Sequence, residues 1–161
     1  MIYMPVVNVR VDARLIHGQV AAVWSSLLQV KRIIVANDEA ETNEIERASL
    51  RMAAPSQIWL SVLNIKKAVT NIKNGRYGNQ RVFLIFQNVL DAKKYVENGG
   101  IIKELTIGNI SHKEGSKTLV KSISVNDEEV AAMKWLETKG TSVIVQTVPN
   151  DPKQDIKTLL K

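Results

Sequence analysis

The chain has 161 residues, of which 45% are hydrophobic and 24% charged, and its formal net charge is +6. This length and composition are typical of a soluble globular protein, so we expect a single domain over residues 1–161. The sequence contains no apolar run near the roughly 20 residues that cross a bilayer. Residues 1–9 also lack the pattern of a signal peptide, and together these features predict a cytoplasmic protein.

The chain contains no cysteine, which excludes disulfides and thiolate metal sites. Its two histidines, His17 and His112, are far apart, so we expect no metal and no cofactor. The basic residues are dispersed in ones and twos and aromatic residues make up 5% of the chain, which argues against nucleic-acid binding. Two lysine pairs, Lys66 with Lys67 and Lys93 with Lys94, are interpreted as lying on solvated outer faces of helices. The alternative is that they form a weak docking patch for an acidic partner.

The first predicted unit is a strand followed directly by a helix. Valines alternate with polar residues from Val6 to Asp12, as in a strand, and apolar residues recur at helical spacing from Val20 to Leu28. The hydrophobic period therefore changes between Asp12 and Gly18, where we expect a polar bend.

The second unit begins with the strand RIIVA, residues 32–36. A helix is predicted to follow, because Asp38 and Glu41 have the spacing of a capping box, and Pro55 is expected to end it. The residues expected to face the core are the apolar ones at helical spacing, namely Ile45, Ala48 and Met52.

The same alternation continues along the chain. Further strands are predicted at 58–62, 81–86, 104–108 and 142–148, and further helices around Ile65–Ile72, Val89–Val96, Val130–Leu136 and from Asp151. Residues 117–125 are expected to form an irregular extended stretch. Alternating strands and helices predict an α/β fold with three layers, an open and mostly parallel β-sheet with helices on both faces. The strand at 81–86 is the most apolar and is expected to be central.

Ligands of such sheets bind beyond the carboxyl ends of the strands. Four polar segments follow predicted strands at these ends, so we expect them to share one edge: Asp12–Gly18, Asn37–Glu41, Gln87–Asn88 and Gly108–Asn109.

The first of these segments has the residues of an anion site that contains a nucleophile. The N-terminus of a helix favours an anion, and the guanidinium groups of Arg10 and Arg14 are suited to a phosphate, each charge-assisted bond contributing about 1.5–3 kcal/mol. An imidazole is mostly the free base at neutral pH, so His17 would accept a phosphoryl group without a separate base. Gly18 is expected to allow a tight turn into the helix and to contribute to phosphate binding together with Arg10 and Arg14.

Each of these residues also has a plainer interpretation. His17 would equally be a helix cap or a solvated loop residue, and Arg10 and Arg14 would pair with Asp12 at the surface, where such pairs contribute about 0–1 kcal/mol. The charge of Arg10 favours a functional site or the end of a strand at this position, because a strand covered on both faces is normally apolar throughout. Asp38 would either cap a helix or orient an arginine or the histidine. For His112 the alternatives are a solvated loop residue and a contact to the bound phosphate.

The sequence resembles one protein family along nearly its whole length. The motif VRVDARLIHGQV, residues 9–20, is similar to the signature of the IIB subunits of the mannose, fructose and sorbose class of the bacterial phosphoenolpyruvate-dependent sugar phosphotransferase system (PTS). The segments ANDE at 36–39, GNISHKEGSKTLVKSISV at 108–125 and QTVPNDP at 146–152 also resemble this family.

The resemblance implies that His17 is phosphorylated transiently, on Nδ1 in family members. The group would come from a phosphohistidine on a IIA protein and pass to the 6-hydroxyl of a sugar imported by the membrane IIC and IID subunits. Arg10 and Arg14 match the arginines that hold the phosphate, and Asp12 matches the acidic position that holds Arg14 or an imidazole proton. The protein would then be cytoplasmic and peripherally associated with the membrane permease.

The same resemblance suggests a sugar. Gly108 with Asn109 and the QTVPNDP segment are closer to the amino-sugar branch, which predicts N-acetylgalactosamine or a related sugar. The alternatives are a mannose-, fructose- or sorbose-specific IIB component and a non-catalytic regulatory module of the same fold.

Overall fold

The computed structural model describes residues 5–160, and its main feature is a seven-stranded sheet in the order β3-β2-β4-β1-β5-β8-β9. All neighbouring strands in it pair in parallel except β9, which runs antiparallel to β8 at one edge. The strands are β1 Val6–Asp12, β2 Arg32–Ala36, β3 Trp59–Leu63, β4 Val82–Phe86, β5 Glu104–Asn109, β8 Ser142–Val145 and β9 Gln154–Asp155. A separate antiparallel hairpin consists of β6 Lys117–Val120 and β7 Ile123–Val125.

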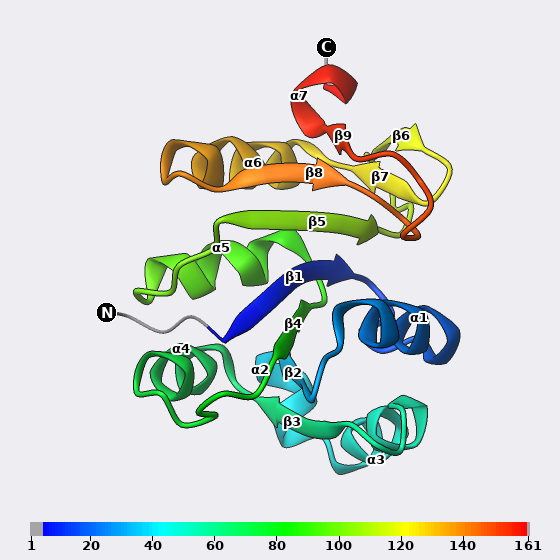
Figure 1. Cartoon of the computed structure of the whole chain (residues 1–161). Helices are drawn as coiled ribbons and strands as arrows, with labels where there is room; N and C mark the ends of the chain where they lie inside the picture. The colour runs from blue at the N-terminus through cyan, green and yellow to red at the C-terminus, as the bar shows by residue number, and fades with distance from the viewer. Residues whose placement is uncertain (1–4, 161) are drawn as a thin grey trace.

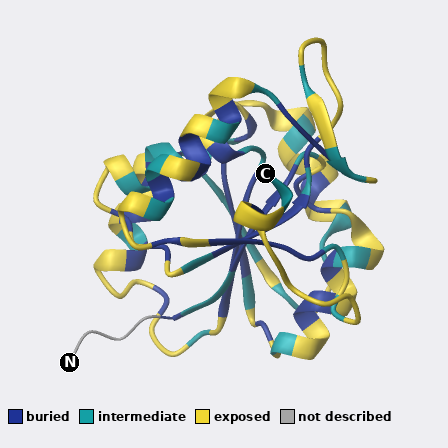
Figure 2. Ribbon diagram, turned by 90° about the horizontal axis from the view of Figure 1, so that it is seen from above, coloured by how far each residue is buried: buried dark blue, intermediate teal, exposed yellow. Residues whose placement is uncertain are grey.

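Helices cover both faces of this sheet, which confirms the predicted three-layer α/β fold (Figure 1). The helices are α1 Gly18–Leu28, α2 Asp38–Thr42, α3 Glu44–Ala53, α4 Ile65–Lys73, α5 Val89–Glu97, α6 Asp127–Thr138 and α7 Ile156–Leu159. Buried residues concentrate in the strands and on the inward sides of the helices, and the outer sides of the helices are exposed (Figure 2).

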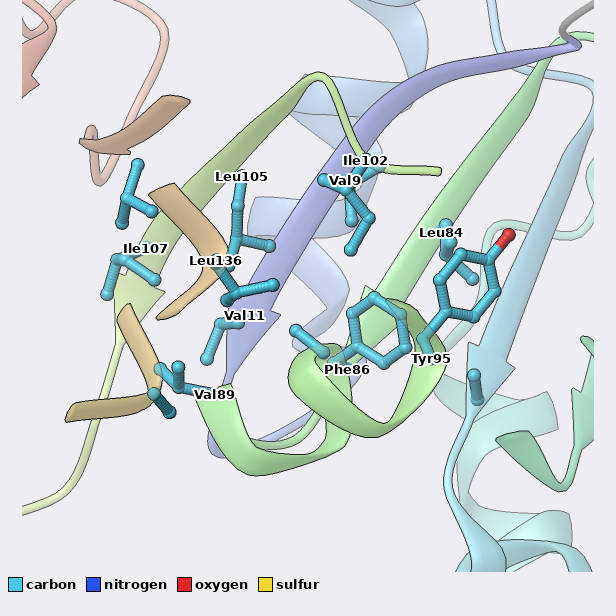
Figure 3. Close-up of a cluster of buried hydrophobic side chains, with 14 of the residues drawn as sticks. Val9, Val11, Leu84, Phe86, Val89, Tyr95, Ile102, Leu105, Ile107 and Leu136 are labelled. Atoms are coloured by element: carbon cyan, nitrogen blue, oxygen red, sulfur yellow. The ribbon is translucent and has the colours of Figure 1, made fainter. Parts of the chain in front are cut away.

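The two faces of the sheet have separate apolar cores, because successive side chains of a strand point to opposite faces. The larger core joins α4, α5, α6 and α7 to the strands, and Figure 3 shows part of it, with Phe86 against Tyr95 at 5.4 Å between ring centroids. The smaller core joins α1, α2 and α3 to the other face, through Trp24, Ala40 and Leu50. As predicted, β4 lies inside the sheet and all of its residues are buried.

The helix predicted from Asp38 to Pro55 differs from the prediction in two ways. Asn43 divides it into α2 and α3, and the expected inward stripe is wrong: Ile45 is 81% exposed, Met52 is 88% exposed and Ala48 is exposed as well. Leu50, on the opposite side of α3, is the residue that enters the core. Periodicity identified an apolar face, and that face points to solvent.

The C-terminal part of the chain also differs from the prediction. The strand expected over 142–148 ends at Val145, and the expected helix at Asp151 begins at Ile156, after the short edge strand β9. Helix α6 contains the residues predicted around Val130–Leu136 and begins with a capping box formed by Asn126 and Glu129.

Candidate active site at the carboxyl edge of the sheet

The four polar segments do lie together at the carboxyl edge of the sheet. Asn37 Nδ2 donates to Gln87 Oε1 at 3.3 Å, and Gln87 Nε2 donates to the Ala13 carbonyl at 3.5 Å. The Ala13 N–H donates in turn to the Asn109 carbonyl at 3.1 Å. These hydrogen bonds join the segments that follow β2, β4, β1 and β5, and the predicted shared edge is confirmed.

The bend after β1 combines a buried anchor with an exposed tip. The N–H of Leu15 donates to the Asp12 carbonyl at 2.9 Å, and the side chains of Leu15 and Ile16 are buried in the smaller core. Leu15 has a φ of 61°, a left-handed conformation that costs a residue with a side chain about 1–2 kcal/mol. Gly18 has no positive φ, so the expectation that glycine is needed for a tight turn there is wrong. The anchored bend leaves His17 and Gly18 exposed.

His17 occupies the N-cap position of α1, and its side chain makes no capping hydrogen bond. Helices α2 to α6 are different, because each has an asparagine N-cap whose side chain accepts a backbone N–H: Asn37, Asn43, Asn64, Asn88 and Asn126. The first turn of α1 also contains no acidic residue. The N–H groups and the positive dipole end of α1 are therefore directed at the exposed bend, where they favour an anion bound next to the imidazole.

Arg14 is held at this bend by Asp12. The Asp12 carboxylate, which is buried, accepts from Arg14 Nε at 3.0 Å, from Arg14 Nη2 at 3.1 Å and from the Arg14 backbone N–H at 2.9 Å. These hydrogen bonds from the guanidinium to Asp12 raise the pKa of Arg14 above its ordinary value. The Arg14 side chain is 41% exposed, so its free edge faces solvent on the same bend as His17.

Arg10 is buried, so the alternative that it forms a surface pair with Asp12 is wrong. Its side chain is 2% exposed and lies 5.5 Å from the centre of the Trp24 ring. Nη1 donates to the Gln146 carbonyl at 3.0 Å and Nη2 to the Thr147 carbonyl at 2.9 Å, and Nε lies 3.7 Å from Asp12 Oδ2. Burial lowers the pKa of Arg10, although the negative charge of Asp12 opposes this effect. Arg10 thus ties β1 to the segment that follows β8.

Sequence reasoning missed three residues that shape the surroundings of Arg10. Gln146 and Thr147 contribute backbone carbonyls, and the Nε1 of Trp24 also donates to the Thr147 carbonyl, at 3.4 Å. Backbone carbonyls cannot be predicted from residue types, because every residue has one. The contact between the Trp24 ring and the Arg10 guanidinium could have been predicted, because Trp24 is on the inner face of α1 and Arg10 is in the preceding strand.

Asp38 does not orient the residues of the bend. Its carboxylate pairs with Lys94 and accepts from the Ile65 N–H at 2.9 Å, and the hydrogen bond from Lys94 lowers the pKa of Asp38. The predicted capping box is also wrong, because Asn37 caps α2 and Glu41 accepts from the Asn64 N–H at 2.9 Å. Both carboxylates therefore bind the start of α4.

His112 lies in the exposed loop after β5, where its Nδ1 is 3.2 Å from Ser116 Oγ. This placement agrees with the plainer of the two interpretations of His112, a solvated loop residue.

Comparison with known proteins defines the family. The family model described as "PTS system sorbose subfamily IIB component" matches residues 6–161. The sorbose-specific EIIB component of Klebsiella pneumoniae is 35% identical over 153 residues, covering 95% of this chain and 93% of that protein. The crystal structure of the IIBSor domain of the sorbose permease from the same organism has a TM-score of 0.91 at 34% identity, covering 96% of this chain and 95% of that one.

Two further relatives carry other sugar names. The mannose-specific EIIAB component of Escherichia coli (strain K12) is 32% identical over 158 residues, which are 98% of this chain and 49% of that longer protein. The N-acetylgalactosamine-specific enzyme IIB component 1 of the same strain is 28% identical over 148 residues, 91% of this chain and 93% of that protein.

The fold, the bend at its carboxyl edge and these matches define the class of the protein, a phosphotransferase component of the PTS. The chain belongs to the sorbose subfamily of PTS IIB components, which confirms the resemblance found in the sequence. In this class the IIB component works with a IIA protein and a membrane IIC/IID permease. Within residues 5–160, the structure contains no helix of the length and apolarity needed to cross a membrane.

Proposed function

We propose that His17 is the phosphoryl carrier of this IIB component. The observation that carries the proposal is the position of His17, an exposed imidazole at the N-terminus of α1, where no side chain caps the helix. Exposure suits a carrier, because the same nitrogen must be reached first by the phosphorylated IIA protein and then by a sugar in the permease.

The two transfers are each a displacement at phosphorus. In the first, a bond forms between the His17 nitrogen and phosphorus while the bond from phosphorus to the donor imidazole breaks. In the second, the 6-hydroxyl oxygen of the sugar bonds to phosphorus, the bond to His17 breaks and the hydroxyl proton is released. Such transfers depend mainly on positioning and on stabilising the charge of the equatorial phosphoryl oxygens.

Two groups on the bend are suited to stabilise that charge. Arg14 has a fixed guanidinium with an exposed edge, and the first N–H groups of α1, beginning with Gly18, point toward the site of the phosphoryl group. Asp12 supports the site by holding Arg14. Arg10 remains a proposed phosphate ligand, and it must exchange its carbonyl partners at residues 146 and 147 to take that role.

We assign the sugar to the sorbose, mannose and fructose group rather than to amino sugars. This preference rests on similarity, because the sorbose-specific relative is more similar to this chain than the N-acetylgalactosamine-specific one. The prediction of N-acetylgalactosamine is not confirmed. We place the transfer at the cytoplasmic side of the permease, as the resemblance implies for this family.

The decisive experiment is intact-mass analysis after incubation with phosphoenolpyruvate and the upstream PTS proteins. The chain is expected to gain one phosphoryl group that is labile in mild acid and stable in base. His17→Ala should gain none, and His112→Ala is the matched control because it removes the other histidine and should be phosphorylated normally. If a demonstrably phosphorylated IIA protein transfers nothing to the wild-type chain, the carrier role is wrong and the regulatory-module alternative takes its place.

The sugar is tested with the phosphorylated chain and membrane vesicles that contain the cognate IIC and IID subunits. Sorbose, mannose, fructose and N-acetylgalactosamine are offered separately, and the sugar phosphate is quantified. Phosphorylation of N-acetylgalactosamine alone would overturn the assignment to the sorbose, mannose and fructose group.

A further inference from the structure

Helix α3 presents an apolar stripe to solvent. Ile45, Ala48 and Met52 are three and seven residues apart, so they lie on one side of the helix, opposite the buried Leu50. Ile45 is 81% exposed and Met52 is 88% exposed. Large apolar side chains that share one exposed helix face are typical of an interaction surface.

One end of this stripe adjoins the carrier histidine. A side chain built at Gly18 would contact the carbonyl oxygen of Ala53 at 3.7 Å, so the last turn of α3 lies against the first turn of α1. Met52, next to Ala53, therefore lies at the His17 end of α3, and the stripe extends away from the bend for about 10 Å along the helix. Figure 1 shows α3 beside α1 on the outer side of the molecule.

The far end of the stripe is acidic, although the chain as a whole is basic. Residues 38–46 contain five of the sixteen acidic residues of the chain and none of its 22 basic residues. Asp38 and Glu41 are engaged with Lys94 and with the start of α4. Glu39 and Glu44 instead line, with Ile45, a shallow hollow of about 610 Å³ at the corner between α2 and α3.

We propose that this surface, the α3 stripe with Glu39 and Glu44, docks the cytoplasmic loops of the membrane subunits that receive the phosphoryl group. The proposal rests on the proposed function of His17. Its chemical basis is charge complementarity, because the cytoplasmic loops of membrane proteins carry an excess of lysine and arginine. An acidic corner would attract such loops, and the exposed Ile45 and Met52 would be buried in the contact as apolar anchors.

The surface is a poor match to the lipid bilayer itself. The cytoplasmic leaflet is negatively charged, so it repels carboxylates and attracts basic segments. A protein partner with basic loops accounts for the acidic corner and the apolar stripe together, and the continuity of the stripe with the His17 bend places that partner over the phosphoryl group.

The test separates the two half-reactions. Two double variants are compared. Ile45→Ser with Met52→Ser removes the large apolar side chains of the stripe, and Glu39→Gln with Glu44→Gln removes two acidic charges. Each phosphorylated variant is titrated into membrane vesicles that contain the IIC and IID subunits and the sugar. We expect the concentration giving half-maximal sugar phosphorylation to rise by at least about tenfold for each pair, with kcat little changed. The glutamine pair should also weaken the dependence of this step on salt.

The rate of phosphorylation by the IIA protein is measured on the same variants and should be unchanged. Ile101→Ser is the matched control, because Ile101 is 57% exposed but precedes β5 at the amino edge of the sheet, and it should behave as wild type in both steps. An unchanged sugar-transfer step, or a slower step from the IIA protein, would overturn the docking proposal while leaving the carrier role intact. Failure of the wild-type chain to be phosphorylated at all would instead contradict the proposed function.

Discussion

Arg10 and Gly108 lie so close together that a Cβ on residue 108 would overlap the Arg10 guanidinium. Gly108 is in β5 beside β1, and the guanidinium extends across its backbone to the Gln146 and Thr147 carbonyls. The close approach gives a structural reason for glycine at position 108, which the sequence had indicated only as part of a polar segment at the carboxyl edge and as a clue to the sugar. The carboxyl ends of β1, β5 and β8 are thereby held together directly behind the His17 bend.

We predict that Gly108→Ala destabilises the protein by about 1–3 kcal/mol, the usual cost of overpacking a buried site. The arginine would have to give up its hydrogen bonds to the Gln146 and Thr147 carbonyls, which it makes in a buried position where its side chain is 2% exposed. Urea denaturation measures the loss. Gly18→Ala is the control, since its new Cβ would make only an ordinary contact at 3.7 Å. Equal stabilities of the two variants would show that Arg10 moves without cost.

The buried Asp12 is predicted to be more important for stability than Asp38. Asp12→Asn removes the negative charge 3.7 Å from the buried Arg10 and one acceptor of Arg14, so the free energy of unfolding should fall by about 3 kcal/mol. Asp38→Asn is the matched substitution in a pair that is close to half exposed, and it should cost much less. Chemical denaturation of both variants at neutral pH makes the comparison, and a similar loss in the two would contradict it.

The Asp38–Lys94 pair also predicts a dependence on pH. Its hydrogen bond lowers the pKa of Asp38 below the ordinary value of 3.8, so the stabilisation is present above that pH and is lost as the pH falls through the folded-state pKa. The pKa of Lys94 is raised above 10.5, so the contribution persists up to that pH and disappears as the pH rises further. The difference in stability between wild type and Asp38→Asn should therefore be present at neutral pH and vanish well below pH 3.8. A difference that persists in acid would show that the carboxylate charge is not its source.

The sequence predicted the sheet and the site edge well because both depend on local patterns. Alternation of strands and helices implies parallel pairing, and parallel strands place the segments after β1, β2, β4 and β5 at one edge whatever the details of packing. The capping box of Asn126 and Glu129 at the start of α6 depends on the same kind of local pattern, since both residues lie within one helical turn.

The long-range contacts of Arg10 and the choice of which face of α3 is buried could not be predicted from the sequence. The partners of Arg10 are backbone carbonyls 136 and 137 residues away, and any residue types would provide them. In α3 the period is the same for a stripe that faces the core and one that faces solvent, so Ile45 and Met52 were assigned inward although Leu50 is the residue that packs. Strand β9, with two residues, is too short to show alternation.

The last prediction concerns Arg14, whose role in transfer can be separated from its role in folding. Arg14 is 41% exposed and its guanidinium bonds only to Asp12 among the described residues, so its removal leaves the apolar cores in place, although the buried Asp12 carboxylate loses two hydrogen bonds. Loss of its charge-assisted bonds to the phosphoryl group, about 1.5–3 kcal/mol, should slow phosphorylation of His17 by about 10- to 100-fold in Arg14→Ala. Arg14→Lys should recover only part of the rate, because an ammonium group keeps the charge but not the planar fork that binds two oxygens.

The rate is measured by rapid quench with the phosphorylated IIA protein in excess, followed by intact-mass analysis. Arg76→Ala is the control, since Arg76 is an exposed arginine on the segment between α4 and β4, at the opposite edge of the sheet. If Arg14→Ala were phosphorylated as fast as this control, the stabilising charge would have to come from elsewhere. Arg10, released from the carbonyls at residues 146 and 147, would then be the remaining arginine at the bend.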